Sequence, residues 1–252
     1  FKSLSNSEAE VCENLEDLLE EDLFNENEED PPLESDWHVA AMNLLINILR
    51  YLWRERNDIY VSGNTSVYFE KGQGRNKFRG PDLYVVKGVP KMPRSSWIKW
   101  KENNIVPHFI LELSSKSTAK FDVEGKKTIY EGQLKTPEYV VYNPHTHKLQ
   151  GWRLTQGYYD SIIPNEHGWL WCQELGLWLG LAPYDFLDGA GSINTPRFFD
   201  QNGQLLPTPN EAEAQRAEQE AKSRHILEKE KEIEYQARQA AEAEIARLKV
   251  LL

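Results

Sequence analysis

Two acidic side chains lie within or next to apolar segments near the middle of the sequence. Asp82 directly precedes the apolar run 83–86, and Glu112 lies inside the run 110–113. Such runs are typical of strands that are buried on both faces, where a carboxylate is costly unless it is paired or bound to a cation. On neighbouring strands, the two carboxylates would form an oxygen site for a hard divalent ion such as Mg²⁺. The alternative is a turn aspartate after Pro81 and a salt-bridged strand glutamate.

The elements that would position these carboxylates follow from the spacing of the apolar residues. We expect strands at 60–70, 80–86, 105–113 and 139–142, and later strands at 149–154, 158–163 and 177–181. A helix at 37–56 carries apolar residues at spacings of three and four, and a second helix is expected at about 123–134. Residues 88–104 are expected to form a loop. This order predicts an α/β or α+β fold with a central mixed sheet flanked by helices.

Composition divides the chain into three parts. Residues 1–34 are expected to form an acidic, partly disordered arm, and 35–206 a globular domain. Residues 207–252 contain no glycine, and no proline after Pro209, which predicts one long helix projecting from the domain. A thin apolar stripe on this helix predicts a weak coiled coil with another copy of the chain, and a solitary solvated helix is the alternative. The stripe consists of Ile226, Ile233, Ala237, Ala241, Ile245, Leu248 and Leu252.

Charge and cysteine content limit the class of protein. The net charge is −11, yet the acidic residues concentrate in the arm, and residues 37–208 carry a net charge of +4. The globular domain is therefore basic enough to permit DNA binding without demanding it. Cys12 and Cys172 lack the spacing of metal ligands, which favours free thiols and a cytoplasmic location. No apolar run is long enough to span a membrane, and the start at Phe1 leaves open a leader that has been removed.

Several motifs together resemble those of one family. They are Pro81-Asp82, the segment 112–118 (Glu-Leu-Ser-Ser-Lys-Ser-Thr), Asp122 with Lys126 and Tyr130, and the segment 137–144 (Pro-Glu-Tyr-Val-Val-Tyr-Asn-Pro). Over roughly 35–200 the chain resembles the Uma-type restriction endonucleases, a family abundant in cyanobacteria within the PD-(D/E)XK nuclease superfamily. The resemblance implies a restriction-endonuclease-like core and Mg²⁺-dependent hydrolysis of phosphodiester bonds in DNA, with Mn²⁺ as a substitute.

The resemblance also implies a role for individual residues. Asp82, Glu112 and the backbone carbonyl of Leu113 would hold the metal ion. The superfamily places a lysine two residues after the second acid, where this sequence has Ser114. In the Uma-type family the lysine lies on the following helix, in the pattern that Asp122, Lys126 and Tyr130 match.

Lys126 would position the attacking water or stabilise developing charge. Residues four apart share one face of a helix, so Lys126 and Tyr130 are expected to point together toward the sheet. Lys127 points about 100° away and is the weaker candidate. Lys116 is expected to be a surface residue close enough in sequence to contact a phosphate.

Other functions remain open on the sequence. One is a nuclease fold without activity that binds DNA or a protein and self-associates through its C-terminal helix. Another is an interaction protein built on the arm and that helix. A zinc site at His145 and His147 is less favoured than exposed loop histidines. His38 could lie near the carboxylates, although a role in the core or at the helix cap is the simpler interpretation.

Overall fold

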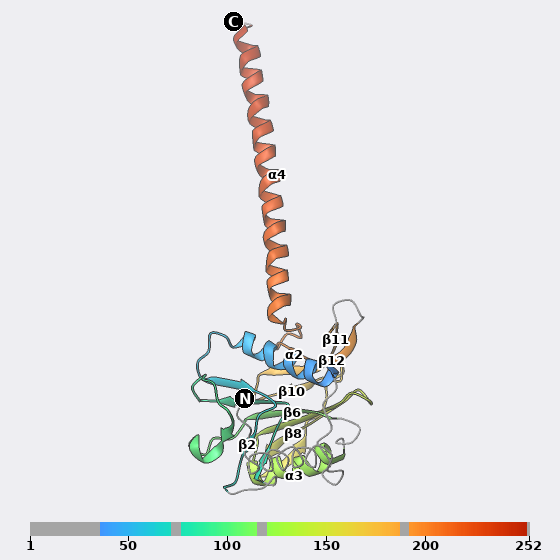
Figure 1. Ribbon diagram of the computed structural model, residues 1–252. Coiled ribbons are helices and arrows are strands. Elements are labelled where there is room, and N and C mark those ends of the chain that lie inside the picture. The colour runs from blue at the N-terminus through green and yellow to red at the C-terminus, as the bar shows by residue number, and fades with distance from the viewer. Residues whose placement is uncertain (1–35, 72–76, 115–119, 187–191, 251–252) are drawn as a thin grey trace, which may run out of the picture. The chain divides into compact units, whose positions relative to one another are not determined.

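The computed structural model describes residues 36–71, 77–114, 120–186 and 192–250. The predicted arm at 1–34, with Cys12, lies outside the described residues, as does Lys116. A six-stranded sheet forms the centre of the fold (Figure 1), and its strands follow the spatial order β1-β4-β6-β7-β8-β9. Its strands are Ile59–Ser62, Leu83–Lys87, Phe109–Leu113, Glu138–Asn143, Lys148–Thr155 and Tyr158–Ser161.

The six-stranded sheet is mixed, as the sequence predicts. Strands β6 and β7 run parallel, whereas the other neighbouring pairs are antiparallel. The first four residues of β4 and all five of β6 are buried because layers cover both faces of the sheet. This double coverage explains the near-continuous apolar runs from which the strands were predicted.

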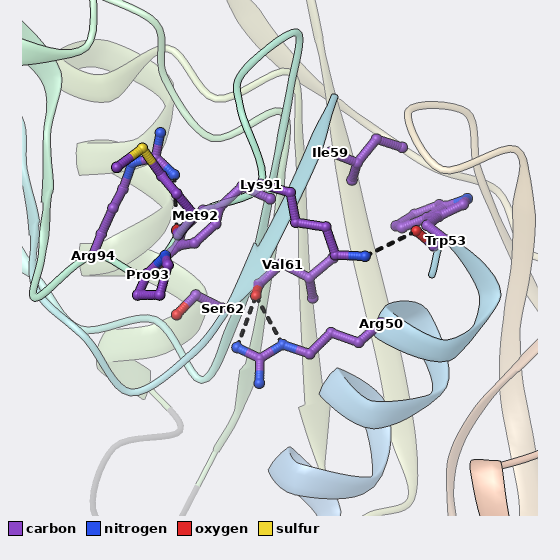
Figure 2. A pocket seen from close by; sticks show the side chains of 10 residues that line it. Arg50, Trp53, Ile59, Val61, Ser62, Lys91, Met92, Pro93 and Arg94 are labelled. Carbon is purple, nitrogen blue, oxygen red and sulfur yellow. Dashed lines mark hydrogen bonds between the residues drawn. The ribbon is translucent and has the colours of Figure 1, made fainter. Parts of the chain in front are cut away.

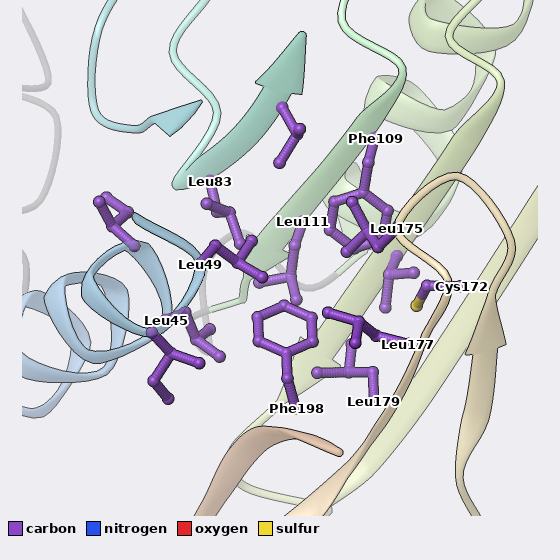
Figure 3. Close-up of a cluster of buried hydrophobic side chains, with 14 of the residues drawn as sticks. Leu45, Leu49, Leu83, Phe109, Leu111, Cys172, Leu175, Leu177, Leu179 and Phe198 are labelled. Atoms are coloured by element: carbon purple, nitrogen blue, oxygen red, sulfur yellow. The ribbon is translucent and has the colours of Figure 1, made fainter. Parts of the chain in front are cut away.

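Helix α2 (Asp36–Leu52) and a second sheet cover one face of the six-stranded sheet. The second sheet consists of β10 (Leu170–Cys172), β11 (Leu177–Tyr184) and β12 (Ile193–Phe199). Figure 3 shows how side chains from the helix and both sheets meet in one core. The sequence predicted α2 and β11 but missed β10 and β12. Among the core residues are Leu45, Leu49, Leu83, Leu111, Leu177 and Phe198.

The opposite face of the six-stranded sheet is covered by the helical segment that follows β6. The segment consists of η3 (Phe121–Lys126), α3 (Lys127–Ile129) and η4 (Tyr130–Leu134). The first and last of these are wide π-type turns, which are frequent at functional sites. Tyr130 and Leu134 pack there against sheet residues that include Tyr139 and Val141.

A third, small sheet contains parts of two segments that were predicted differently, the strand at 60–70 and the loop at 88–104. It consists of β3 (Phe78–Arg79), β2 (Val67–Tyr68) and β5 (Trp97–Ile98). The strand predicted at 60–70 is therefore wrong as a single element, because β1 and β2 belong to different sheets. The loop predicted at 88–104 contains β5 and the short 3₁₀-helix η2 (Lys99–Lys101).

The break between β1 and β2 lies against the backbone next to a predicted site residue. A Cβ atom at Gly63 would lie 1.9 Å from the Asp82 carbonyl oxygen, so only glycine fits there. The next residue, Asn64, has a positive φ of 49° and donates its N–H to the Pro81 carbonyl at 2.8 Å. The chain thus turns away from the first sheet and holds the start of β4 in place.

Helix α4 (Pro209–Val250) is a single helix of 42 residues, as predicted. It begins at a reciprocal cap, in which Thr208 Oγ1 accepts from Glu211 N at 3.1 Å and Glu211 Oε2 accepts from Thr208 N at 2.7 Å. Beyond its first turn the described side chains are exposed. None of the helices in the described part of the chain combines the length and apolar composition needed to cross a membrane.

Candidate active site

The structure brings Asp82 and Glu112 to the same face of the six-stranded sheet. Leu83 pairs with Leu111 in the antiparallel register of β4 and β6, so the same register places Asp82 opposite Glu112. Directly opposed residues of an antiparallel pair lie on one face. The Asp82 charge accordingly acts on Glu112 and raises its pKa. The two residues are 6% and 1% exposed, so both carboxylates are withdrawn from bulk water.

The Asp82 carboxylate is held by a hydrogen-bond partner on each oxygen. Oδ2 accepts from the backbone N–H of Leu113 at 2.6 Å, and Oδ1 lies 2.9 Å from Nε2 of His38. The N–H and C=O of one strand residue point to the same side of the strand. The Leu113 carbonyl therefore faces the side of β6 on which Asp82 lies.

Glu112 is held by two groups from the helical segment 120–134. Its Oε1 accepts from the Tyr130 hydroxyl at 2.7 Å, and its Oε2 lies 3.0 Å from Nζ of Lys126. Lys126 and Tyr130 thus point together toward the sheet, in the arrangement expected from their spacing. Burial raises the pKa of Glu112 to about 8 against the opposing effect of Lys126, and the charges of Asp82 and Asp122 add to the rise.

Asp122 adds a third buried carboxylate on the other side of Lys126. Its Oδ1 lies 2.9 Å from Lys126 Nζ, four residues along the chain, and the residue is 1% exposed. Burial alone would lower the pKa of Lys126, but Glu112 and Asp122 raise it well above its ordinary value. Lys126 is therefore a fixed positive charge between two carboxylates. Lys127 lies instead over the ring of Trp152, with Nζ 5.1 Å from the ring centroid.

Two residues of this cluster had no assigned role on the sequence. His38 comes from the first turn of α2, and the structure supports the less favoured of its two expected places, near the carboxylates, because its ring contacts Asp82. Asp122 belonged to the recognised motif without a role. The signal available for Asp122 was its spacing from Lys126 and Tyr130. No local pattern pairs His38 with Asp82, since 44 positions separate them.

The chemistry of this cluster fits a hard divalent cation. Three buried carboxylates lie close together, two of them in contact with Lys126, and Asp122 Oδ1 accepts no hydrogen bond beyond its ion pair. Within the described ranges, no group of three or more histidine, cysteine, aspartate or glutamate side chains is arranged to hold a metal ion alone. Mg²⁺ does not require such a cage, because it is usually bound by one or two carboxylates with water and substrate phosphate. His145 and His147 belong to no such group either.

A pocket away from this cluster lies beside the edge strand β1. It has a volume of about 450 Å³ and is lined by α2, β1 and residues 91–94 (Figure 2). Its basic side chains already have partners: Arg50 donates to the Val61 carbonyl, Lys91 to two backbone carbonyls in the turn that follows α2, and Arg94 to Glu102. These contacts explain the basic residues structurally, so we place the candidate active site at the carboxylates.

Comparisons with known proteins identify a family and a similar solved structure. A solved structure similar to this chain is the crystal structure of a "putative nuclease belonging to DUF820" from Anabaena variabilis ATCC 29413. It is 13% identical, has a TM-score of 0.39, and the match covers 53% of this chain and 74% of that one. No curated protein matches the chain. The model of the Uma2 family, described as "Putative restriction endonuclease", matches residues 12–183, which is more than half of the chain, and the chain therefore belongs to this family.

Proposed function

We propose that this protein is a metal-dependent endonuclease that hydrolyses phosphodiester bonds in DNA. One observation carries the proposal: Glu112 is buried between Asp82 and Asp122, and Glu112 and Asp122 both contact the ammonium group of Lys126. A cluster with more negative than positive charge, buried beside a strand end, favours a divalent cation. Membership of a family of restriction-endonuclease type supports DNA as the substrate.

Each residue of the cluster has a distinct role in this proposal. Asp82, Glu112 and the Leu113 carbonyl would hold Mg²⁺, or Mn²⁺ in its place. The bound ion would supply a water of lowered pKa and neutralise charge on the phosphate. Lys126 keeps its proton and presents a fixed positive charge, which positions the water or stabilises the developing negative charge. Tyr130 holds Glu112 in orientation through its hydroxyl.

Cleavage of defined DNA tests the proposal directly. The full chain is incubated with single- and double-stranded DNA in Mg²⁺, in Mn²⁺ and in a chelator. We expect cleavage that needs the ion and that falls by at least 10²–10³-fold in Asp82→Asn and Glu112→Gln, because each loses one charged ligand. Circular dichroism of both variants provides the control for folding.

An inactive wild-type protein would support the second function considered for this fold. If no DNA is cleaved in Mg²⁺ or Mn²⁺, but DNA binds with an affinity that falls with salt, the protein is a binding module. The exposed helix α4 is the feature of the structure that favours an assembly role of this kind.

A further inference from the structure

We propose that His38 is a positioning residue, which fixes the Asp82 carboxylate in the orientation that a divalent cation requires. This inference rests on the proposed function. Its central observation is the 2.9 Å contact between His38 Nε2 and Asp82 Oδ1, with the two side chains only 12% and 8% exposed. An ionised carboxylate only accepts hydrogen bonds, so Nε2 carries the proton and donates.

The geometry leaves Asp82 little freedom. A donor on each oxygen, Leu113 N on Oδ2 and His38 on Oδ1, prevents the carboxylate from rotating about its Cβ–Cγ bond. Each oxygen retains a lone pair beyond its hydrogen bond. The remaining lone pairs can then face Glu112 and an ion without a change in side-chain conformation. Partners of metal ligands that act in this way typically change metal affinity or activity by about 10–100-fold.

Two features of α2 fix His38 itself. The helix packs along the face of the six-stranded sheet opposite Glu112, through core residues such as Leu45 and Leu49. In its first turn, the ring of Trp37 lies 5.9 Å from the ring of Tyr142, which belongs to the strand next to β6. The packing of the whole helix therefore places the imidazole at the end of the sheet where Asp82 lies. A histidine that served only to pack the helix would not need to contact the Asp82 carboxylate.

Binding of Mn²⁺ alone, measured by calorimetry or by electron paramagnetic resonance, tests this inference. We expect His38→Ala to raise the Kd for Mn²⁺ by about tenfold or more. His38→Gln carries an amide N–H near the position of Nε2, so it should recover most of the affinity. In cleavage assays, His38→Ala should lower kcat while the KM for DNA stays close to that of the wild type.

The control is His108→Ala. His108 is also partly buried, and its Nδ1 accepts the Lys87 N–H at the opposite end of β4 and β6. It should bind Mn²⁺ as tightly as the wild type, and melting curves would show the loss of stability common to both alanine variants. Equal Mn²⁺ affinity of His38→Ala and the wild type would overturn the inference alone. A wild-type protein that binds no Mn²⁺ would overturn the inference and the metal-dependent function together.

Discussion

Glu112 is a residue whose proposed function opposes the stability of the fold, because binding a metal ion requires a charged carboxylate and burial disfavours that charge. It is 1% exposed and lies near two other carboxylates, and among the described residues Lys126 and the Tyr130 hydroxyl stabilise its charge. Because its pKa is raised from 4.5 to about 8, the Glu112 carboxyl of the folded, metal-free protein keeps a proton between these pH values, whereas the unfolded chain releases it. A bound divalent cation would remove this conflict, since it compensates the charge that the protein leaves uncompensated.

The raised pKa of Glu112 predicts a pH dependence of stability in the presence of a chelator. The stabilisation from this proton is complete below the ordinary value of 4.5 and is lost as the pH rises through about 8. Between pH 5.5 and 8 the wild type should therefore lose roughly 1 kcal/mol of unfolding free energy per pH unit relative to Glu112→Gln. Thermal melts of both proteins across this range measure the difference. Parallel curves would show that Glu112 is ionised in the folded protein.

The two adjacent lysines provide a matched pair for testing the placement of the positive charge. Lys126→Ala should reduce cleavage by about 10²–10³-fold, because one preorganised charged group is lost. Lys127→Ala should leave cleavage close to that of the wild type, since its Nζ lies over Trp152. Gel-based cleavage rates decide between them, with circular dichroism as the control for folding. If Lys127→Ala is inactive and Lys126→Ala is active, the lysine has been misplaced although the class of enzyme stands.

At the scale of elements, the site depends on where the chain leaves one sheet for another. The turn after β1 presses against the backbone of Asp82, and the wide turns of η3 and η4 present Lys126 and Tyr130 to the end of β6. Both features are local departures from regular structure. Departures of this kind concentrate where a fold must position functional groups.

The close approach at Gly63 gives a prediction for this turn. Gly63→Ala should lower the unfolding free energy by about 1–3 kcal/mol, because the new methyl group overlaps the Asp82 carbonyl. Gly132→Ala is the matched control, since a Cβ there meets nothing within 4 Å and the residue lies in the helical segment η4. It should be neutral or stabilising by up to about 1 kcal/mol. Denaturant unfolding measures both, and equal midpoints would contradict the steric account.

At the scale of the whole molecule, α4 contributes a long surface that no described part of the chain covers. Its isoleucines Ile226, Ile233 and Ile245 are more than half exposed, and ion pairs such as Lys222 with Glu218 accompany them along the helix. Such a helix gains stability when a second copy buries the apolar stripe. The many alanines of the stripe limit the area that this pairing would bury.

Association through α4 is therefore expected to be weak and dependent on concentration. Light scattering should show a dimer of the full chain at high concentration and a monomer when both Ile226 and Ile233 are changed to Glu. Leu227→Glu is the control, because Leu227 is 56% exposed but lies outside the stripe. A monomer at every concentration, unchanged when residues 217–252 are deleted, would show that α4 is a solitary helix.

Much of the candidate site follows from local sequence. The apolar runs around Asp82 and Glu112 predict buried strands, because two covered faces require apolar side chains on both. The spacing of Lys126 and Tyr130 predicts a shared face, and both residues do contact Glu112. The family pattern assigned the same residues to catalysis, and this assignment stays a prediction. The long helix α4 was also predictable, because its segment contains no glycine, and no proline after Pro209, that would interrupt a helix.

Only the tertiary structure decided the rest. The segment 60–70 looks like one strand, yet it is divided between two sheets because Gly63 must pass close to the Asp82 backbone. The sequence left His38 between a place near the carboxylates and a role in the core or at the helix cap, and the residue reaches Asp82 because α2 packs across a sheet whose strands come from far along the chain. The raised pKa of Glu112 likewise depends on its burial, and on the charges of Asp82 and Asp122, which other segments of the chain supply. The sequence determined which groups could do the chemistry, and long-range packing determined which of them meet.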